Sequence, residues 1–225
     1  MNRSDSRRQR ILDAAYSLFR ARGFDETSMS DITTQVGGSK ATIYGYFGSK
    51  ERLFVESVIS ALDDYMAAPL ERLGSGESDP AAALRDFGTD VLNFVCSAEQ
   101  LELRRLMIAQ AARSGTGKLF FDKVNSLRAR VAAFLAGCMA AGTLRRADPE
   151  LAAHQLGALL EAEILEPLLL HARKGAPSRK ETALAAKRAV EAFLRAYAPG
   201  GEAQPAEREA RTREDESRRD AAVDE

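Results

Sequence analysis

Apolar side chains recur three or four positions apart along most of the chain, a spacing that places them on one face of an α-helix. This pattern predicts long helices over residues 7–22, 50–73, 80–97, 99–113, 117–141, 149–173 and 179–197. No stretch alternates between apolar and polar residues for long enough to predict a β-strand. We therefore expect an all-α protein.

Two short helices separated by a glycine turn are predicted between the first two long ones. Ser28 can cap the first short helix, and Asp31 lies at the capping-box spacing from it. Gly37 and Gly38 allow a tight turn, because glycine adopts positive φ angles at little cost. Ser39 can cap the second short helix, whose outer face carries small, polar and aromatic residues. This order of elements is typical of a helix-turn-helix, whose second helix enters the major groove of DNA.

The helix over residues 7–22 supplies an apolar stripe on which the two short helices can pack, which gives a three-helix head. Such a core is near the lower size limit for independent stability, so we expect help from the chain that follows. The helix from Lys50 towards Leu73 connects the head to the rest, and Pro69 should bend or end it. Residues 1–10 are polar and basic, which is typical of a flexible arm that either reaches DNA or simply ends the chain in solvent.

The two C-terminal helices, over residues 149–173 and 179–197, are apolar on more than one side. Pro167 falls inside the first of them and predicts a kink. A terminal helix pair with surplus apolar surface is typical of a four-helix bundle formed by two copies of a chain. We expect a homodimer through these helices, the alternative being burial inside one large monomer core.

The distribution of charge tells more than its total. The 225-residue chain is 45% hydrophobic and carries a formal net charge of -1. Residues 1–50 hold eight Lys/Arg and five Asp/Glu, whereas residues 199–225 hold five Arg and nine acids. A basic head on a neutral body is typical of a nucleic-acid-binding module. The acidic C-terminal stretch has almost no large aliphatic side chain, so it should be disordered.

The candidate chemistry of the chain does not indicate an enzyme. Residues 115–118, GTGK, imitate the end of a phosphate-binding loop, but Ala112 and Leu119 stand where that motif needs Gly and Ser/Thr. Cys96 and Cys138 lie among apolar residues without metal-ligand spacing, so we expect two buried thiols and no metal or other cofactor. There is neither a signal-peptide pattern nor an apolar run of bilayer-spanning length, which indicates a cytoplasmic protein that does not enter the membrane.

The stretch from Gly23 to Phe54, GFDETSMSDITTQVGGSKATIYGYFGSKERLF, resembles the DNA-binding domain of the TetR family of transcriptional regulators. The resemblance lies in the spacing of Thr27-Ser28, Ile32, Val36-Gly37, Ser39, Thr42-Ile43-Tyr44, Tyr46-Phe47, Ser49-Lys50-Glu51 and Leu53. Gly38 and Ala41 depart from the family pattern, which often has valine and glycine there, but both are small enough for the turn to survive. Residues 101–171 also resemble, more loosely, the C-terminal domain of the AefR-like subgroup.

The resemblance implies a DNA-binding head, a linker helix, and a helical domain that dimerises and binds a small-molecule effector. The corresponding boundaries are residues 1–48 for the arm and head, 49–79 for the linker helix and loop, 80–198 for the effector-binding and dimerisation domain, and 199–225 for the tail. The implied function is a regulator, by family default a repressor, that an effector of unknown identity releases from a palindromic operator in double-stranded DNA. The alternative is a dimeric helical ligand-binding or interaction protein without a transcriptional role.

Carried over residue by residue, the family pattern assigns DNA binding to Ser28, Ser39, Lys40, Ala41, Thr42, Tyr44, Gly45, Tyr46 and Lys50. Hydroxyls and N–H groups at helix starts suit phosphate oxygens, and Lys50 adds a point charge. The face that meets base edges consists of Lys40, Ala41, Tyr44 and Gly45. For Tyr46, a half-buried position in the core is an equally open alternative.

The candidates for the effector pocket are aromatic, Met and Gln side chains on the helices predicted within residues 80–141. They are Phe87, Phe94, Met107, Gln110, Phe121 and Phe134. The alternative for each is plain core packing, since pockets are few in any protein. Glu163 and Glu166 lie in an apolar helix and face either a cationic effector or, as the alternative, solvent or the dimer edge.

Overall fold

The computed structural model describes residues 3–76 and 79–199. Within these ranges the chain forms helices and no strand, which confirms the all-α fold. The helices are α1 (Arg3–Arg22), α2 (Met29–Val36), α3 (Lys40–Phe47), α4 (Lys50–Gly74), α5 (Pro80–Val95), α6 (Ala98–Ser114), α7 (Gly117–Ala140), α8 (Pro149–Glu161), α9 (Leu165–Leu169) and α10 (Arg179–Ala196). Almost all of the predicted disordered tail lies outside the described residues.

The first helix begins earlier than the apolar pattern predicted. α1 starts at Arg3, so the expectation of a flexible arm is wrong for residues 3–10. This segment contains neither Gly nor Pro, and Asp5 in the first turn suits the positive end of the helix dipole. Polar residues therefore extend the helix beyond its buried stripe.

The single helix predicted over residues 149–173 is two helices in the structure. α8 ends at Glu161, and α9 begins at Leu165. In a continuous helix the ring of Pro167 would clash with the carbonyl of Glu163. The chain breaks before that point, so Pro167 occupies the first turn of α9, where its missing N–H costs no intrahelical bond. The predicted kink at Pro167 is therefore wrong, and the break lies upstream of it.

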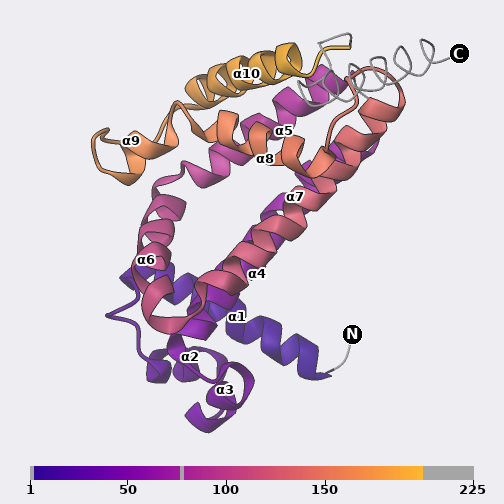
Figure 1. Cartoon of the computed structure of the whole chain (residues 1–225). Coiled ribbons are helices and arrows are strands. Elements are labelled where there is room, and N and C mark those ends of the chain that lie inside the picture. Colours follow the sequence, from indigo (N-terminus) through magenta and orange to yellow (C-terminus); the bar gives the residue numbers. More distant parts are fainter. Residues whose placement is uncertain (1–2, 77–78, 200–225) are drawn as a thin grey trace, which may run out of the picture.

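The helices α1, α2 and α3 form the head at one end of the molecule, and the start of α4 closes its core (Figure 1). Phe19 stacks on Phe24 with 5.7 Å between ring centroids and meets Phe54 of α4 edge-on at 5.2 Å. Ile32 of α2 and Phe47 of α3 are fully buried beside them. Burial of these side chains fixes α2 and α3 on α1.

The body is built around the two longest helices, α4 and α7, which lie side by side (Figure 1). The linker α4 continues past Pro69 to Gly74, so Pro69 does not end the helix. The helices α5, α8 and α10 pack on one another at the far end from the head. A β-carbon on Gly88 of α5 would lie 2.6 Å from Leu160 of α8 and 3.4 Å from Ala186 of α10. The absent side chain of Gly88 therefore allows these three helices to approach closely.

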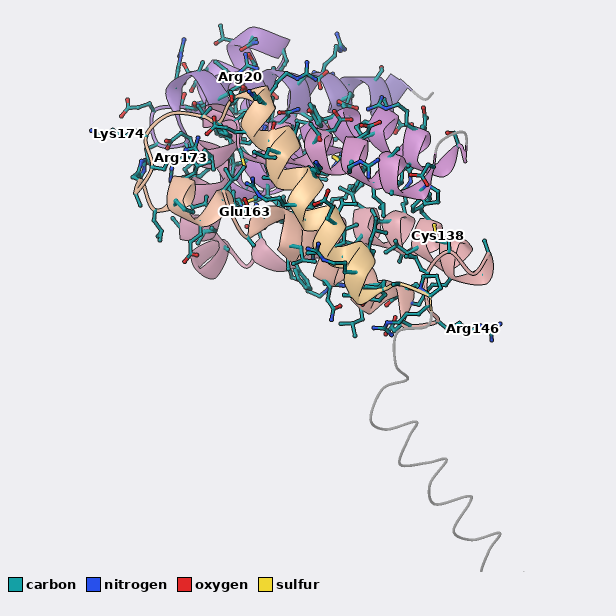
Figure 2. The ribbon with its side chains drawn as sticks, turned by 90° about the horizontal axis from the view of Figure 1, so that it is seen from above. Arg20, Cys138, Arg146, Glu163, Arg173 and Lys174 are labelled. Carbon is teal, nitrogen blue, oxygen red and sulfur yellow. The ribbon has the colours of Figure 1, made fainter. Side chains whose placement is uncertain are left out.

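Figure 2 shows α10 lying across the top of the molecule, with Arg173 near one end and Arg146 near the other. The backbone N–H of Arg145 donates to the carbonyl of Tyr197 just after α10, at 2.9 Å. The guanidinium of Arg145 also lies over the ring of Tyr197, 4.6 Å from its centroid. These contacts fasten the end of α10 to the turn between α7 and α8.

Helix α6 belongs to both parts of the molecule. Its Leu103 and Met107 are buried in the core of the head. On another side, Arg105 donates hydrogen bonds to the carbonyls of Leu168 and Leu169 at the end of α9, the latter at 2.8 Å. The head thus obtains the additional packing that its small size requires.

A membrane-spanning helix was not expected from the sequence. Among the described helices, none combines the length and the apolar character that a bilayer span needs.

Candidate DNA interface and internal cavity

The start of α2 is held by a reciprocal capping box, as predicted. Ser28 Oγ accepts from the backbone N–H of Asp31 at 3.2 Å, and Asp31 Oδ2 accepts from the Ser28 N–H at 2.8 Å. The hydroxyl of Ser28 also donates to Asp31 at 2.6 Å, and its bonds hold the pKa of Asp31 below the usual value. Ser28 must therefore give up its bond to Asp31 before its hydroxyl can donate to a DNA phosphate.

The second helix of the motif, α3, begins after a turn in which Gly37 has a φ of 74°. Ser39 caps it by accepting from the N–H of Thr42 at 3.2 Å, and the two hydroxyls share a further hydrogen bond of 3.0 Å. Only one of the two hydroxyls can be the donor in that bond, so the hydrogen of the other stays available to a phosphate at this helix start. Ile43 and Phe47 are buried, which fixes the rotation of α3.

That rotation exposes the four residues predicted to meet base edges. Lys40, Ala41, Tyr44 and Gly45 are all solvent-exposed, and 45% of Tyr44 is accessible. A β-carbon built on Gly45 meets no protein atom within 4 Å, so the backbone of α3 can approach a flat surface closely there. Tyr46 is half-buried, with its ring 6.1 Å from that of Phe47. Both interpretations of Tyr46 therefore stay open.

Lys50, at the start of α4, lies next to the head. Its Nζ is 4.3 Å from the centroid of the Phe24 ring, a cation–π contact. Ser49 caps α4 by accepting from the N–H of Arg52 at 3.1 Å. Lys50 thus occupies a defined place at a helix N-terminus, which suits an anionic partner.

The first turns of α1 bring further cations to the helix-turn-helix. Arg8 pairs with the buried carboxylate of Glu56, which also accepts from Arg52 at 2.7 Å. Arg7 is exposed, and a β-carbon on Gly38 would lie 2.6 Å from its guanidinium. Arg7 therefore lies against the turn between α2 and α3. The sequence indicated only that basic residues precede the motif, not that they lie on it.

The body contains a cavity of about 280 Å³ between α4, α5, α7 and α8. Three of the six predicted pocket residues line it together: Phe87, Phe94 and Phe121. Phe87 is buried, Phe94 stacks on Tyr65 at 4.3 Å between centroids, and Phe121 is exposed at the edge. The wall is otherwise mainly aliphatic and aromatic, with Leu62, Met66, Val91, Val95, Phe120, Val124, Leu127, Val131, Ala153, Leu156, Gly157 and Leu160.

The other three predicted pocket residues lie elsewhere. Met107 is buried in the core of the head, because that side of α6 faces α1 and α4. Phe134 lies about one turn beyond Val131, the last cavity residue on α7, and lines a separate groove beside α4. The side chain of Gln110 is outside the described part of the structure. Helical spacing predicts that Met107 and Phe134 face inward. It does not show whether such a side chain enters the core of the head or that of the body.

Three charged residues that were not predicted line the cavity: Arg104, Arg128 and Glu161. Arg104 of α6 donates two hydrogen bonds to Glu161 at the end of α8, at 3.3 and 3.2 Å. Arg128 of α7 donates to the side-chain oxygen of Asn125 at 3.1 Å. Both arginines lie on helices with several other charged residues, so no signal in the sequence distinguished them from their neighbours.

The two glutamates and two cysteines that the sequence analysis singled out do not line the cavity. Glu163 is exposed and accepts two hydrogen bonds from Nε of Arg188 on α10, at 2.9 and 3.0 Å, and bonds from this guanidinium lower its pKa. Glu166 is exposed as well. Cys96 and Cys138 are free and buried, as predicted, and burial raises the pKa of Cys96 to about 11. In the part of the chain that the structure describes, no three His, Cys, Asp or Glu residues gather as metal ligands would.

The capped helix pair with an exposed second helix, mounted on a separate helical body, defines a helix-turn-helix DNA-binding protein. Two family profiles match this chain: the bacterial regulatory proteins of the tetR family over residues 11–56, and the C-terminal domain of AefR-like transcriptional repressors over residues 82–199. The chain therefore belongs to the TetR family of DNA-binding transcriptional regulators.

Solved structures agree with this assignment. A TetR-family transcriptional regulator from Mesorhizobium loti MAFF303099 is 30% identical with a TM-score of 0.76, over 88% of this chain and all (100%) of that one. The flavonoid-responsive regulator FrrA is 28% identical with a TM-score of 0.67, over 88% of this chain and 100% of FrrA.

Matches to curated proteins are shorter. The transcriptional regulator AcrR of Shigella flexneri is 32% identical over 101 residues, which is 45% of this chain and 46% of AcrR. Two uncharacterised regulators of Bacillus subtilis, YfiR and YdeS, are matched over 29% and 50% of their lengths. The chain thus spans at most half the length of these three relatives.

Proposed function

We propose that this regulator is a repressor that binds a palindromic operator as a homodimer and leaves it when a small molecule enters the cavity of the body. The observation that carries the proposal is the geometry of α3. Its buried side, Ile43 and Phe47, is fixed in the head, so its opposite side presents Lys40, Tyr44 and Gly45 to solvent as one surface. A helix of this kind fits the major groove and reads base edges there.

Dimerisation is supported by apolar side chains left exposed on the two helices predicted to carry it. Leu151 of α8 and Leu184 of α10 are 49% and 47% exposed in the single chain. Packing of α8 and α10 on their copies would bury these side chains in a four-helix bundle. Two-fold symmetry would then place the two α3 helices about 34–36 Å apart, one turn of DNA.

Release is supported by the position of α6 between cavity and head. Arg104 lines the cavity, whereas Leu103, one residue earlier, is buried in the core of the head. A ligand that moves α6 or α4 therefore acts directly on the packing of the head. It favours release only to the extent that it binds the released state more tightly than the DNA-bound state.

The mainly apolar wall, with Phe87, Phe94, Phe120 and Phe121, suits a flat aromatic compound. FrrA is a flavonoid-responsive regulator, and flavonoids are flat aromatic compounds of this kind. The cavity volume of about 280 Å³ is near the lower end of small-molecule pockets, which favours a compact ligand.

Selection of genomic DNA by the purified protein tests the proposal, followed by affinity measurements on the selected fragment and on a shuffled copy. Lys40→Ala should weaken binding to the selected fragment by about tenfold or more, the loss expected for one base contact. Lys174→Ala is the matched control, since this lysine is exposed in the loop between α9 and α10, away from the head. Failure to select any sequence, or equal effects of the two substitutions, would contradict the proposal and favour a ligand-binding or interaction protein without a transcriptional role.

A further inference from the structure

The two arginines that line the cavity differ in how their charge is balanced. Arg104 forms its two hydrogen bonds with the carboxylate of Glu161, so this pair is neutral. The hydrogen bond of Arg128 goes to a neutral amide oxygen, that of Asn125 on the preceding turn of α7. Among the described residues that line the cavity, Glu161 is the single carboxylate. The wall therefore carries one positive charge without a balancing negative one.

The surroundings of Arg128 are unusual for such a charge. It is half-buried on α7, and the cavity residues next to it along this helix are Val124, Leu127 and Val131. A guanidinium beside apolar side chains interacts more strongly with an opposite charge than it would in water, because the local dielectric constant is lower. Its planar fork of N–H donors matches the two oxygens of a carboxylate.

We propose that the cavity takes a small aromatic acid, and that Arg128 is the residue that binds its anionic group. This inference rests on the proposed effector role of the cavity and adds the chemical class of the ligand. The aromatic part would lie among Phe87, Phe94 and the side chains around them. The acidic group would replace Asn125 or add to it as a partner of the guanidinium.

A cationic ligand fits the same wall poorly. Glu161 already accepts two hydrogen bonds from Arg104, and the described part of the cavity lining provides no second carboxylate. A cation would also lie in the same low-dielectric space as Arg128 and be repelled by it. A neutral aromatic compound would fill the cavity but leave the charge of Arg128 unbalanced.

Three probes of one shape test the inference: 2-naphthoate, its neutral amide 2-naphthamide, and the cation 2-naphthylmethylammonium. Their dissociation constants are measured by calorimetry on the full-length protein without DNA. 2-Naphthoate should bind at least about tenfold more tightly than 2-naphthamide, the gain expected for a hydrogen bond to a charged group, and the cation should bind most weakly.

Arg128→Gln should reduce the preference for 2-naphthoate over the amide to within about twofold, and Arg128→Lys should retain part of it. Arg130→Gln is the matched control: it removes the same charge from an exposed position on the same helix, outside the cavity lining, and should leave the preference unchanged. Circular dichroism on each variant separates loss of binding from loss of folding.

Equal binding of naphthoate and amide by the unmodified protein, binding of none of the three probes, or an unchanged preference in Arg128→Gln would each overturn the inference. Its failure is distinguishable from failure of the proposed function, because these affinities are measured without DNA. A protein that selects an operator yet ignores aromatic acids remains a repressor with another ligand. A protein that binds naphthoate through Arg128 and selects no DNA is not a repressor.

Discussion

The side-chain amide of Gln100 donates a hydrogen bond of 2.6 Å to the hydroxyl of Tyr16, joining the first turn of α6 to the middle of α1. Beside it, Arg20 of α1 and Glu99 of α6 form an ion pair at 2.7 Å. The head is thus attached to the body by polar contacts as well as by the apolar side of α6. Tyr16 is partly buried, and its burial raises the pKa of its hydroxyl.

Replacing Tyr16 by Phe should lower the free energy of unfolding by about 0.5–1.5 kcal/mol, because one hydrogen bond is lost and the amide of Gln100 loses its partner. Urea unfolding of Tyr16→Phe, Gln100→Ala and the double variant measures the coupling of the two side chains. A coupling energy indistinguishable from zero would mean that this bond does not fasten α6 to the head.

Substitution of Gly45 by Ala should separate DNA binding from folding. No protein atom lies within 4 Å of the added methyl group, so the variant should be more stable by about 0.5–1 kcal/mol, the usual gain when Ala replaces Gly inside a helix. Affinity for the operator should nevertheless fall by about tenfold or more, because the methyl group stands between α3 and the bases.

Gly137→Ala provides the comparison for Gly45→Ala. Gly137 lies inside α7 with equally open space around its missing side chain, far from the head. It should show the same gain in melting temperature with unchanged affinity for DNA. Unchanged DNA affinity in Gly45→Ala would place the DNA surface elsewhere on the head.

A charge on the exposed apolar side of α10 should prevent dimerisation. Leu184→Glu would bury a carboxylate without a partner in the expected bundle, and sedimentation velocity should then detect monomers. Ile108→Glu makes the same change on α6, where the side chain is 63% exposed, and should leave the dimer intact. If the unmodified protein sediments as a monomer, the predicted bundle of α8 and α10 is wrong.

The capping box at the start of α10 should make part of the stability depend on pH. Glu181 accepts hydrogen bonds from the N–H and the hydroxyl of Ser178, both at 2.9 Å, and one from Arg173 at 2.6 Å. These bonds, that of the Ser178 backbone first, lower the pKa of Glu181 to about 2. In the unfolded chain a glutamate has a pKa of about 4.3. The carboxylate therefore stabilises the fold above about pH 4.3 and loses this effect as the pH falls towards 2.

Thermal unfolding of Glu181→Gln and of the unmodified protein at pH 7, 5 and 3 measures this contribution. The difference between their melting temperatures should be constant from pH 7 to 5 and smaller at pH 3. Glu191→Gln, which removes a carboxylate 3.8 Å from Lys187 on the same helix, is the control and should show little difference at any of these pH values. A difference for Glu181→Gln that grows at low pH would contradict the sign of this effect.

Local signals in the sequence were sufficient for the helix-turn-helix. Serines at 28, 39 and 49 are all helix caps in the structure, and the glycine turn follows α2 as predicted. Each of these signals depends on neighbours within four residues, which the sequence contains in full. The exposed face of α3 follows in the same way, because burial of Ile43 and Phe47 fixes its rotation.

Features that depend on distant contacts could not be predicted in this way. Met107 and Phe87 both lie on predicted helices at apolar positions, yet one enters the core of the head and the other lines the cavity. The two side chains enter different parts of the molecule because α6 passes beside the head whereas α5 does not. No local pattern in the sequence encodes these paths. The pairing of Arg104 with Glu161, 57 residues apart, has the same origin. It is this pairing that leaves Arg128 as the unbalanced charge of the cavity.

The burial of Leu103 and Met107 in the core of the head also limits how such regulators can be recombined. A chimaera that kept α1 to α4 and joined them to a foreign sensor after Gly74 would remove these two buried side chains from the hydrophobic core it meant to transplant. Heads and sensors of this architecture are therefore exchangeable only when the matching side of α6 is transferred with the head. The same constraint couples the evolution of operator recognition to that of α6, a helix that never contacts the operator in the proposed mechanism.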